Sequence, residues 1–246
     1  MTTPGGWWDE AFRAAYLEVY HHRDDAQAAV EVAGLLPRLR RAPGVVVDAA
    51  CGAGRHLAAL RAAGIPAVGF DLSADLLAAA RQRHACAGRL VRGDLRAPPL
   101  AGDCGAVLCL FTAFGYFDDD SNAACLAALA GMLAPGGWLV LDLPDPQRIR
   151  SGLLAHSERS TPGGWRVVEG RRLDGQRVIK TVEATPPGGP TRRWEERVRI
   201  YTIDELTSLA PPNLRVDACW RSLSGPESDD GRQVVWLSRQ ISSRNA

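Results

Sequence analysis

The fold of this chain is decided by the stretch VVVDAACGAGRH at residues 45–56. Three β-branched residues end at an acid, Asp48, and small residues then lead into a helical pattern. Gly52 and Gly54 let the backbone pass close to a ligand without a Cβ in the way. The helix N-terminus behind them offers free N–H groups and a partial positive charge. This unit therefore suits a pyrophosphate or an amino-acid carboxylate, although a lone Gly-x-Gly also occurs in tight turns that bind nothing.

The surrounding pattern predicts the fold class. Short continuous apolar runs, typical of parallel strands buried on both faces, lie at residues 45–47, 67–70, 89–91, 106–111 and 138–143. Helical patterns at 55–63, 74–82 and 122–133 separate them, with Ser73 and Ser121 as N-caps and Gly64 after a C-terminus. The sequence predicts an α/β, Rossmann-like doubly wound sheet of seven mostly parallel strands, with a ligand site at their carboxyl ends.

The rest of the chain divides into further regions. Helical patterns at 10–20 and 25–40 predict an N-terminal helical cover over residues 1–42. Alternating polar and apolar residues at 165–171, 177–183 and 192–201 predict an antiparallel β insertion after strand 5. A short helix at 204–209 and strands at 214–220 and 233–237 complete the main sheet. We expect a core of residues 43–150 plus 202–246 and an insertion of 151–201 that forms a substrate lid.

Two acids lie at the ends of neighbouring predicted strands. Asp71 ends the second strand, where a carboxylate can accept hydrogen bonds from both hydroxyls of a ribose. Asp94 closes the third strand, where it can accept from an adenine amino group while the Leu95 N–H reaches a ring nitrogen. The alternatives are a helix cap for Asp71 and a plain solvent turn for Asp94. If both acids face one crevice, they bind an adenosine.

Two cofactor classes fit this geometry, and two residues favour one of them. A dinucleotide needs the third glycine of G-x-G-x-x-G, but Leu57 takes that place. An acid at Asp48 would repel a pyrophosphate, whereas it can face the amino group of a methionine moiety. The pattern therefore favours S-adenosylmethionine over a nicotinamide dinucleotide.

Taken together, the motifs resemble the class I S-adenosylmethionine-dependent methyltransferases, and more narrowly their bacterial small-molecule branch. That branch reads DxxCGTGRH, GxDLS, GDxR, LFTSFGYF, LxPGG and RxYTxxEL. The matching segments in this chain are residues 48–56, 69–73, 93–96, 110–117, 133–137 and 199–206. The resemblance covers nearly the whole chain and is specific for fold and cofactor, not for substrate. Ala50, where many relatives have the first glycine, departs from the pattern, as does the Ala-Pro-Pro-Asn stretch at 210–213.

The resemblance implies how each part of the cofactor is held. The loop at residues 50–54, with Ala50, Cys51, Gly52 and Gly54, would lie along the methionine part, beside Asp48. Arg55 and Tyr16 would hold its carboxylate, and the carbonyl of Leu110 or Phe111 would receive its amino group. Asp71 would bind the ribose, Leu72 would pack on the adenine, and Asp94 and Leu95 would read the adenine edge.

The acceptor side is less specific. Candidate substrate-binding residues are Tyr116, Phe117 and Trp165, and weak candidates for a catalytic group are Tyr116 and His156. Tyr116 would equally suit packing, and a lone loop histidine such as His156 more often lies in solvent. Methyl transfer from a sulfonium chiefly requires alignment, so no catalytic triad needs to be visible. The sequence predicts transfer to an oxygen, nitrogen or carbon atom of a small molecule, with S-adenosylhomocysteine as the product.

Composition bounds the partners. A formal net charge of +1 offers no basic face to a phosphate backbone, which disfavours nucleic acid. Six scattered cysteines lack CxxC spacing, so we expect no metal site and a reducing, cytoplasmic setting. No segment suits a signal peptide or a membrane span. Monomer and homodimer stay open, as do a cyclase, a non-catalytic cofactor-binding partner and methylation of a macromolecule.

Overall fold

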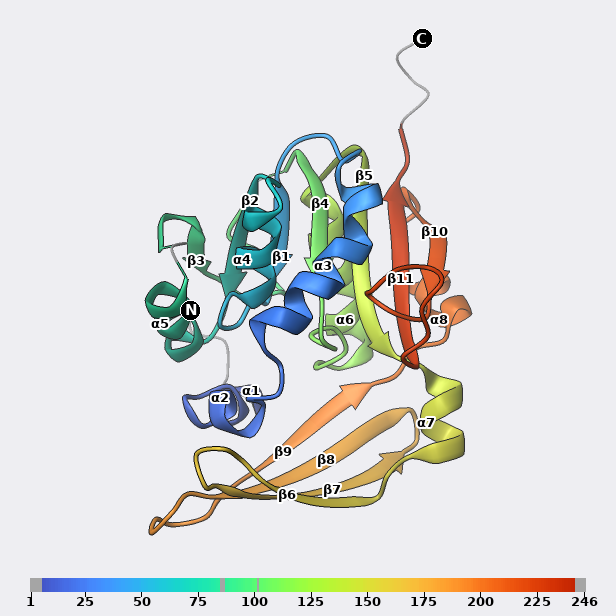
Figure 1. Cartoon of the computed structure of the whole chain (residues 1–246). Helices are drawn as coiled ribbons and strands as arrows, with labels where there is room; N and C mark the ends of the chain where they lie inside the picture. The colour runs from blue at the N-terminus through green and yellow to red at the C-terminus, as the bar shows by residue number, and fades with distance from the viewer. Residues whose placement is uncertain (1–5, 85–86, 101, 242–246) are drawn as a thin grey trace.

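The computed structural model describes residues 6–84, 87–100 and 102–241. These residues form two β-sheets, and most of the helices pack against the larger one (Figure 1). The main sheet has seven strands in the order β10-β11-β5-β4-β1-β2-β3. Its strands are β1 (Val46–Ala49), β2 (Ala67–Asp71), β3 (Leu90–Arg92), β4 (Cys104–Cys109), β5 (Leu133–Pro144), β10 (Leu214–Trp220) and β11 (Arg232–Arg239). Only β11 runs antiparallel to its neighbours, which confirms the predicted mostly parallel, doubly wound sheet.

Helices cover both faces of this sheet. On one face α3 (Asp25–Leu39), α4 (Arg55–Ala62) and α5 (Ala74–Arg83) bury residues such as Leu35, Leu60 and Leu77. On the other face α6 (Asp119–Gly131) and α8 (Ile203–Leu209) bury Leu126 and Leu206. A one-turn 3₁₀ helix, η1 (Ala87–Arg89), leads into β3. Successive residues of the central strands point into alternate layers, which explains why their sequences are continuously apolar.

The second sheet has four antiparallel strands in the order β6-β7-β8-β9 and follows α7 (Pro146–Gly152). Its strands are β6 (His156–Ser160), β7 (Arg166–Asp174), β8 (Arg177–Thr185) and β9 (Arg192–Arg199). Figure 1 shows it below the end of the main sheet where β5 finishes, with α1 (Trp8–Ala11) and α2 (Ala15–Val19) beside it. Among the described residues, no helix is long and apolar enough to cross a membrane.

Several predicted boundaries are wrong for identifiable reasons. The single helix expected at 10–20 is two short helices, because the chain bends at Phe12, whose carbonyl accepts a hydrogen bond from Ser73 Oγ at 2.6 Å. Ser121 is not an N-cap. Asp118 caps α6 by accepting from Ser121 N at 2.8 Å, and the helix begins three residues earlier than expected. The sequence pattern missed β6, because its residues HSERS lack β-branched side chains.

Candidate functional site

Two adjoining cavities lie at the carboxyl ends of β1, β2, β3 and β4. The larger has a volume of about 580 Å³ and the smaller about 230 Å³. Both are lined by Tyr16, Ala50, Gly52, Leu110 and Phe111, so the cavities meet at these residues. A cleft at the strand carboxyl ends is where doubly wound sheets bind ligands.

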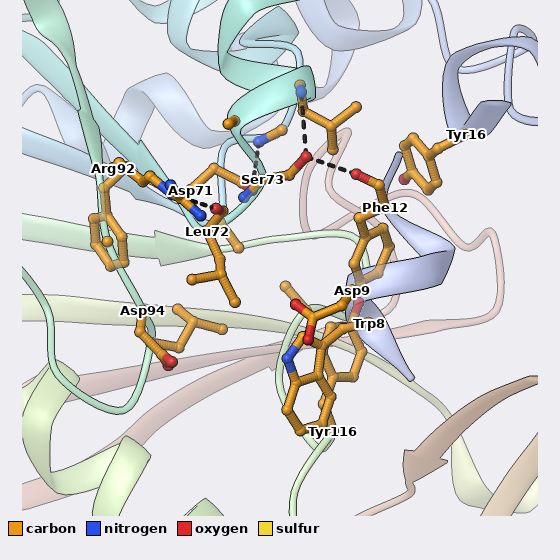
Figure 2. Close-up of a pocket in the computed structure, with 18 of the residues that line it drawn as sticks. Trp8, Asp9, Phe12, Tyr16, Asp71, Leu72, Ser73, Arg92, Asp94 and Tyr116 are labelled. Atoms are coloured by element: carbon orange, nitrogen blue, oxygen red, sulfur yellow. Dashed lines mark hydrogen bonds between the residues drawn. The ribbon is translucent and has the colours of Figure 1, made fainter. Parts of the chain in front are cut away.

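Asp71 and Asp94 both line the larger cavity, as the sequence predicted (Figure 2). Asp71 Oδ2 accepts from Gly52 N at 2.8 Å and its Oδ1 from Ser73 N at 2.7 Å, so the carboxylate also fixes the loop after β1. Burial raises the pKa of Asp71, although these backbone hydrogen bonds oppose the shift. A carboxylate has room for further donors beyond these backbone groups, which suits a ribose hydroxyl.

Asp94 is held differently, because the Arg96 side chain clamps it. Arg96 Nη2 donates to Asp94 Oδ2 at 2.6 Å, and its Nε lies 3.1 Å from Oδ1. Burial alone would raise the pKa of Asp94, but the hydrogen bonds from Arg96 outweigh it and lower the pKa. The Arg96 guanidinium in turn lies over the ring of Phe117, 4.7 Å from its centroid. Asp94 therefore presents a carboxylate acceptor, clamped by Arg96, at the cavity wall.

The smaller cavity contains buried polar atoms that lack partners. Asp48 is 2% exposed, and its Oδ2 has no hydrogen-bond partner among the described residues. Burial raises the pKa of Asp48 to about 7, with Arg55 opposing the shift and Asp71 adding to it. Arg55 Nη2 is likewise buried without a partner, while its Nη1 lies 3.2 Å from Glu31 Oε2. A carboxylate oxygen and a guanidinium nitrogen that each lack a partner suit the amino and carboxylate groups of one amino acid.

A strained turn separates the two cavities. Phe111 and Thr112 both have positive φ, 56° and 62°, which costs non-glycine residues about 1–3 kcal/mol each. The Asp142 side chain stabilises the turn by accepting from Phe111 N at 2.7 Å, while the Asp142 carbonyl accepts from Thr112 N at 3.0 Å. These two hydrogen bonds to Asp142 explain why the strand expected at 106–111 stops at Cys109.

Aromatic side chains from the N-terminal cover close the larger cavity (Figure 2). The Tyr116 ring packs against Trp7 at 4.8 Å and Phe12 at 5.7 Å between centroids, and Phe12 packs against Tyr16 at 5.2 Å. Among the described residues, the Tyr116 hydroxyl makes no hydrogen bond, and burial raises its pKa well above the usual value. Tyr116 can therefore offer its hydroxyl to a ligand.

The insertion sheet contributes a buried ionic cluster, which we call the Glu169 cluster. Glu169 lies 2.8 Å from Lys180, 2.8 Å from Arg159 and 2.5 Å from Arg171. Burial would raise the pKa of Glu169, but these three cations lower it to about 2. Lys180 also donates to the Tyr20 hydroxyl on the N-terminal cover. The cluster attaches the insertion to the cover.

The structure brings together nearly all the site residues that the sequence predicted. The predicted cofactor-binding residues that line the cavities are Tyr16, Asp48, Ala50, Cys51, Gly52, Arg55, Asp71, Leu72, Asp94, Leu95, Leu110 and Phe111. Gly54 lies behind them as the N-cap of α4, with φ of 79°.

The acceptor-side candidates are only partly brought together. Tyr116 and Phe117 line the larger cavity. Trp165 lines neither cavity and packs against a cluster that contains Val19 and Tyr20. His156 lies exposed in strand β6 instead of on a loop, and it also lines neither cavity.

Sequence reasoning missed Glu31, which pairs with Arg55, and Arg23, which lines the smaller cavity. It also missed Asp142, which holds the Phe111 turn, and Arg232, which donates to Asp142. The only available signal was an acid, Asp142, inside an otherwise apolar strand.

The arrangement of sheet, glycine loop and two strand-end carboxylates defines the class of protein as a class I S-adenosylmethionine-dependent methyltransferase. A family model described as a methyltransferase domain matches residues 46–137.

Curated relatives agree. The chain is 33% identical, over 74% of each chain, to a dTDP-3-amino-3,6-dideoxy-alpha-D-glucopyranose N,N-dimethyltransferase of Streptomyces fradiae. It is 28% identical, over 69% of this chain and 67% of the relative, to a dTDP-3-amino-3,4,6-trideoxy-alpha-D-glucopyranose N,N-dimethyltransferase of Streptomyces venezuelae.

A solved structure with the cofactor bound is also similar. CalS10, an amino pentose methyltransferase from Micromonospora echinaspora, matches with a TM-score of 0.70 at 25% identity, covering 98% of this chain and 99% of its own. The chain belongs to the S-adenosylmethionine-dependent methyltransferases and is an enzyme that methylates a small molecule. This overturns the nicotinamide alternative.

Proposed function

We propose that this enzyme methylates the amino nitrogen of an amino sugar carried on a nucleoside diphosphate. The observation that carries the proposal is the 33% identity, over three quarters of both chains, to the Streptomyces fradiae N,N-dimethyltransferase. The Streptomyces venezuelae relative acts on a sugar with the same 3-amino group but one further deoxygenation. An amino group at the sugar is therefore the feature that these two relatives' substrates share.

The cavities support one placement of the cofactor, which is part of the proposal. The adenosine would occupy the larger cavity, with Asp71 at its ribose and Asp94 and Leu95 at its adenine edge. Of the acidic and basic residues that line this cavity, four are aspartates and two are arginines, which suits a neutral nucleoside next to a cationic sulfonium better than a phosphate. The amino-acid end would occupy the smaller cavity, between Asp48 and Arg55.

When bound, S-adenosylmethionine would supply an electrophilic methyl group to the lone pair of the neutral amine and would leave as S-adenosylhomocysteine, and the methylated nitrogen would release a proton to water before a second transfer. The chain contributes alignment, which can supply about 7–11 kcal/mol of the barrier. The Tyr116 hydroxyl, which has no partner of its own, would orient the amine, and the surrounding aromatic faces would stabilise the developing cation.

The insertion and the N-terminal cover would together enclose the acceptor. Glu18 of α2 accepts from Gly163 N at 3.1 Å, and Arg159 donates to the Val19 carbonyl at 2.8 Å, so the two regions are attached at several points. We propose this unit as the substrate lid, with residues 43–150 plus 202–246 as the catalytic core. A cytoplasmic enzyme that acts as a monomer or homodimer, and not on nucleic acid, completes the proposal.

The decisive experiment offers the enzyme S-adenosylmethionine with dTDP-3-amino-3,6-dideoxyglucose, and in parallel with the matched sugar whose 3-amino group is a hydroxyl. Mass spectrometry should show a gain of one and then two methyl groups on the amino sugar only. Methylation of the hydroxyl sugar, or no methylation of either sugar by enzyme that binds the cofactor, would refute the amino-sugar assignment.

A further inference from the structure

The Leu110–Phe111–Thr112 turn, which lies between the two cavities, is stabilised by an ion pair whose two residues line neither cavity. Asp142 lies on β5 with 0% exposure, and Arg232 begins β11, the next strand of the sheet. Arg232 Nη1 forms a charged hydrogen bond with Asp142 Oδ2, the same oxygen that accepts from Phe111 N at 2.7 Å. Neither residue lines the larger or the smaller cavity.

Arg232 also contacts the turn directly. Its guanidinium lies over the Phe111 ring, 4.2 Å from the centroid, and Arg55 and Arg23 lie over the same ring at 4.1 and 4.6 Å. Phe111 is thus fixed through both its backbone N–H and its ring, in a left-handed conformation that a phenylalanine rarely adopts. Removing these contacts would let the turn relax to ordinary backbone angles.

We propose that Asp142 and Arg232 are positioning residues for the cofactor: they hold the Leu110–Phe111–Thr112 turn so that a backbone carbonyl of Leu110 or Phe111 faces the amino group of the methionine moiety. A carbonyl direction depends on the backbone angles of its own peptide, and two consecutive left-handed residues set those angles here. The inference rests on the cofactor placement proposed above, and not on the identity of the acceptor.

The test compares two ligands by calorimetry: S-adenosylhomocysteine, and 5′-methylthioadenosine, which lacks the amino-acid end. Asp142→Asn removes the charge that Arg232 pairs with, and should weaken S-adenosylhomocysteine binding about tenfold while changing 5′-methylthioadenosine binding by less than about twofold. Equal weakening of both ligands, or no change in either, overturns the inference.

Arg232→Gln provides a second variant should Asp142→Asn fail to fold, because it leaves the bond between Asp142 and Phe111 N in place. It should weaken S-adenosylhomocysteine binding relative to 5′-methylthioadenosine binding, as Asp142→Asn does, but by a smaller factor. Arg221→Gln is the control: it also removes arginine–aspartate pairs, to Asp145 and Asp229 at 3.1 Å each, at a residue that lines neither cavity, and should leave the ratio unchanged.

Arg55→Gln tests the proposed placement of the cofactor's amino-acid end, on which the inference about Asp142 and Arg232 rests. If Arg55→Gln changes the ratio and the Asp142 and Arg232 variants do not, the placement holds and the positioning role is refuted. If none of the three variants changes the ratio, the amino-acid end lies elsewhere and both are refuted.

Discussion

The edge of the main sheet where the two cavities lie, which we call the cofactor edge, buries its charged groups in a different way from the insertion sheet. At the cofactor edge, burial raises the pKa of Asp48 to about 7, and one of its oxygens has no partner. In the insertion, three cations surround Glu169 and its pKa falls to about 2. Both carboxylates are almost fully buried, so burial alone does not separate them.

The difference shows how a binding site can be distinguished from a structural cluster. Buried polar groups in proteins are nearly always satisfied, so a buried carboxylate oxygen that lacks a partner at a cavity wall, as in Asp48, indicates a ligand site. A buried carboxylate that is surrounded by cations of its own chain, as in Glu169, indicates a structural role. In the insertion, three basic residues surround a buried acid, Glu169, instead of facing a ligand or solvent.

The largest effect should come from Glu169→Gln. It leaves three partly buried cations without their shared anion, and we expect the free energy of unfolding to fall by about 3 kcal/mol in urea titrations. Glu183→Gln is the matched control, because its pair with Arg193 is exposed, and should cost less than about 0.5 kcal/mol. Equal losses in both variants would contradict the structural role of the Glu169 cluster.

Asp71→Ala should weaken S-adenosylhomocysteine binding by about 1.5–3 kcal/mol in calorimetry, because charged hydrogen bonds to the ribose are lost. It also leaves Gly52 N and Ser73 N without an acceptor, so the melting temperature should fall as well. Asp75→Ala changes an exposed carboxylate that lines the same cavity and should alter the affinity little. An unchanged dissociation constant for Asp71→Ala would exclude that residue from the site.

Tyr116→Phe removes a hydroxyl without partners and keeps the ring contacts with Trp7 and Phe12. We expect kcat to fall about tenfold while S-adenosylhomocysteine affinity changes by less than about twofold. Tyr201→Phe is the control, since the Tyr201 hydroxyl accepts from Asn122 at 2.9 Å inside the core, and it should lower stability instead. A loss of affinity in Tyr116→Phe would place that hydroxyl at the cofactor.

Asp48 should make stability and binding depend on pH in opposite directions. Because its pKa is raised to about 7, the neutral form stabilises the unliganded fold below about pH 4, and this stabilisation is lost as pH rises through about 7. A charge pair with the methionine amino group needs the ionised form, so affinity for S-adenosylhomocysteine should rise severalfold between about pH 6 and 7.5. It should fall again at higher pH, where the ligand's α-amino group loses its proton.

Calorimetry and thermal melting across this pH range measure both trends. Asp48→Asn should abolish the rise in affinity, and the same rise in that variant would show that another group titrates.

The smallest expected change in stability comes from Ala50→Gly, which tests the one departure from the family's glycine pattern. Ala50 has φ of 57°, a conformation that costs alanine about 1 kcal/mol, so Ala50→Gly should stabilise the protein by about 0.5 kcal/mol after the entropy that glycine loses on folding. Ala58→Gly, in the interior of helix α4, should destabilise by about 1 kcal/mol. Urea titrations measure both, and a destabilised Ala50→Gly would contradict the strain.

Much of the fold and of the cofactor edge followed from the sequence, because both depend on local patterns. Continuous apolar runs set the buried parallel strands, and residues at strand ends come to one edge by topology, which is why Asp71 and Asp94 line a common cavity. Trp165 and His156 were misplaced, because an alternating pattern does not say which face of a sheet is covered, or by what.

The sequence by itself therefore determined the order of the elements, the cofactor class and a set of candidate site residues, most of which line the two cavities. Only the tertiary structure decided which charged groups meet: Asp142 pairs with Arg232, 90 residues away in the sequence, and Glu169 lies among cations from β6, β7 and β8. The physical reason is that burial and neighbouring charges set whether a group is ionised and partnered, and both arise from contacts between distant segments.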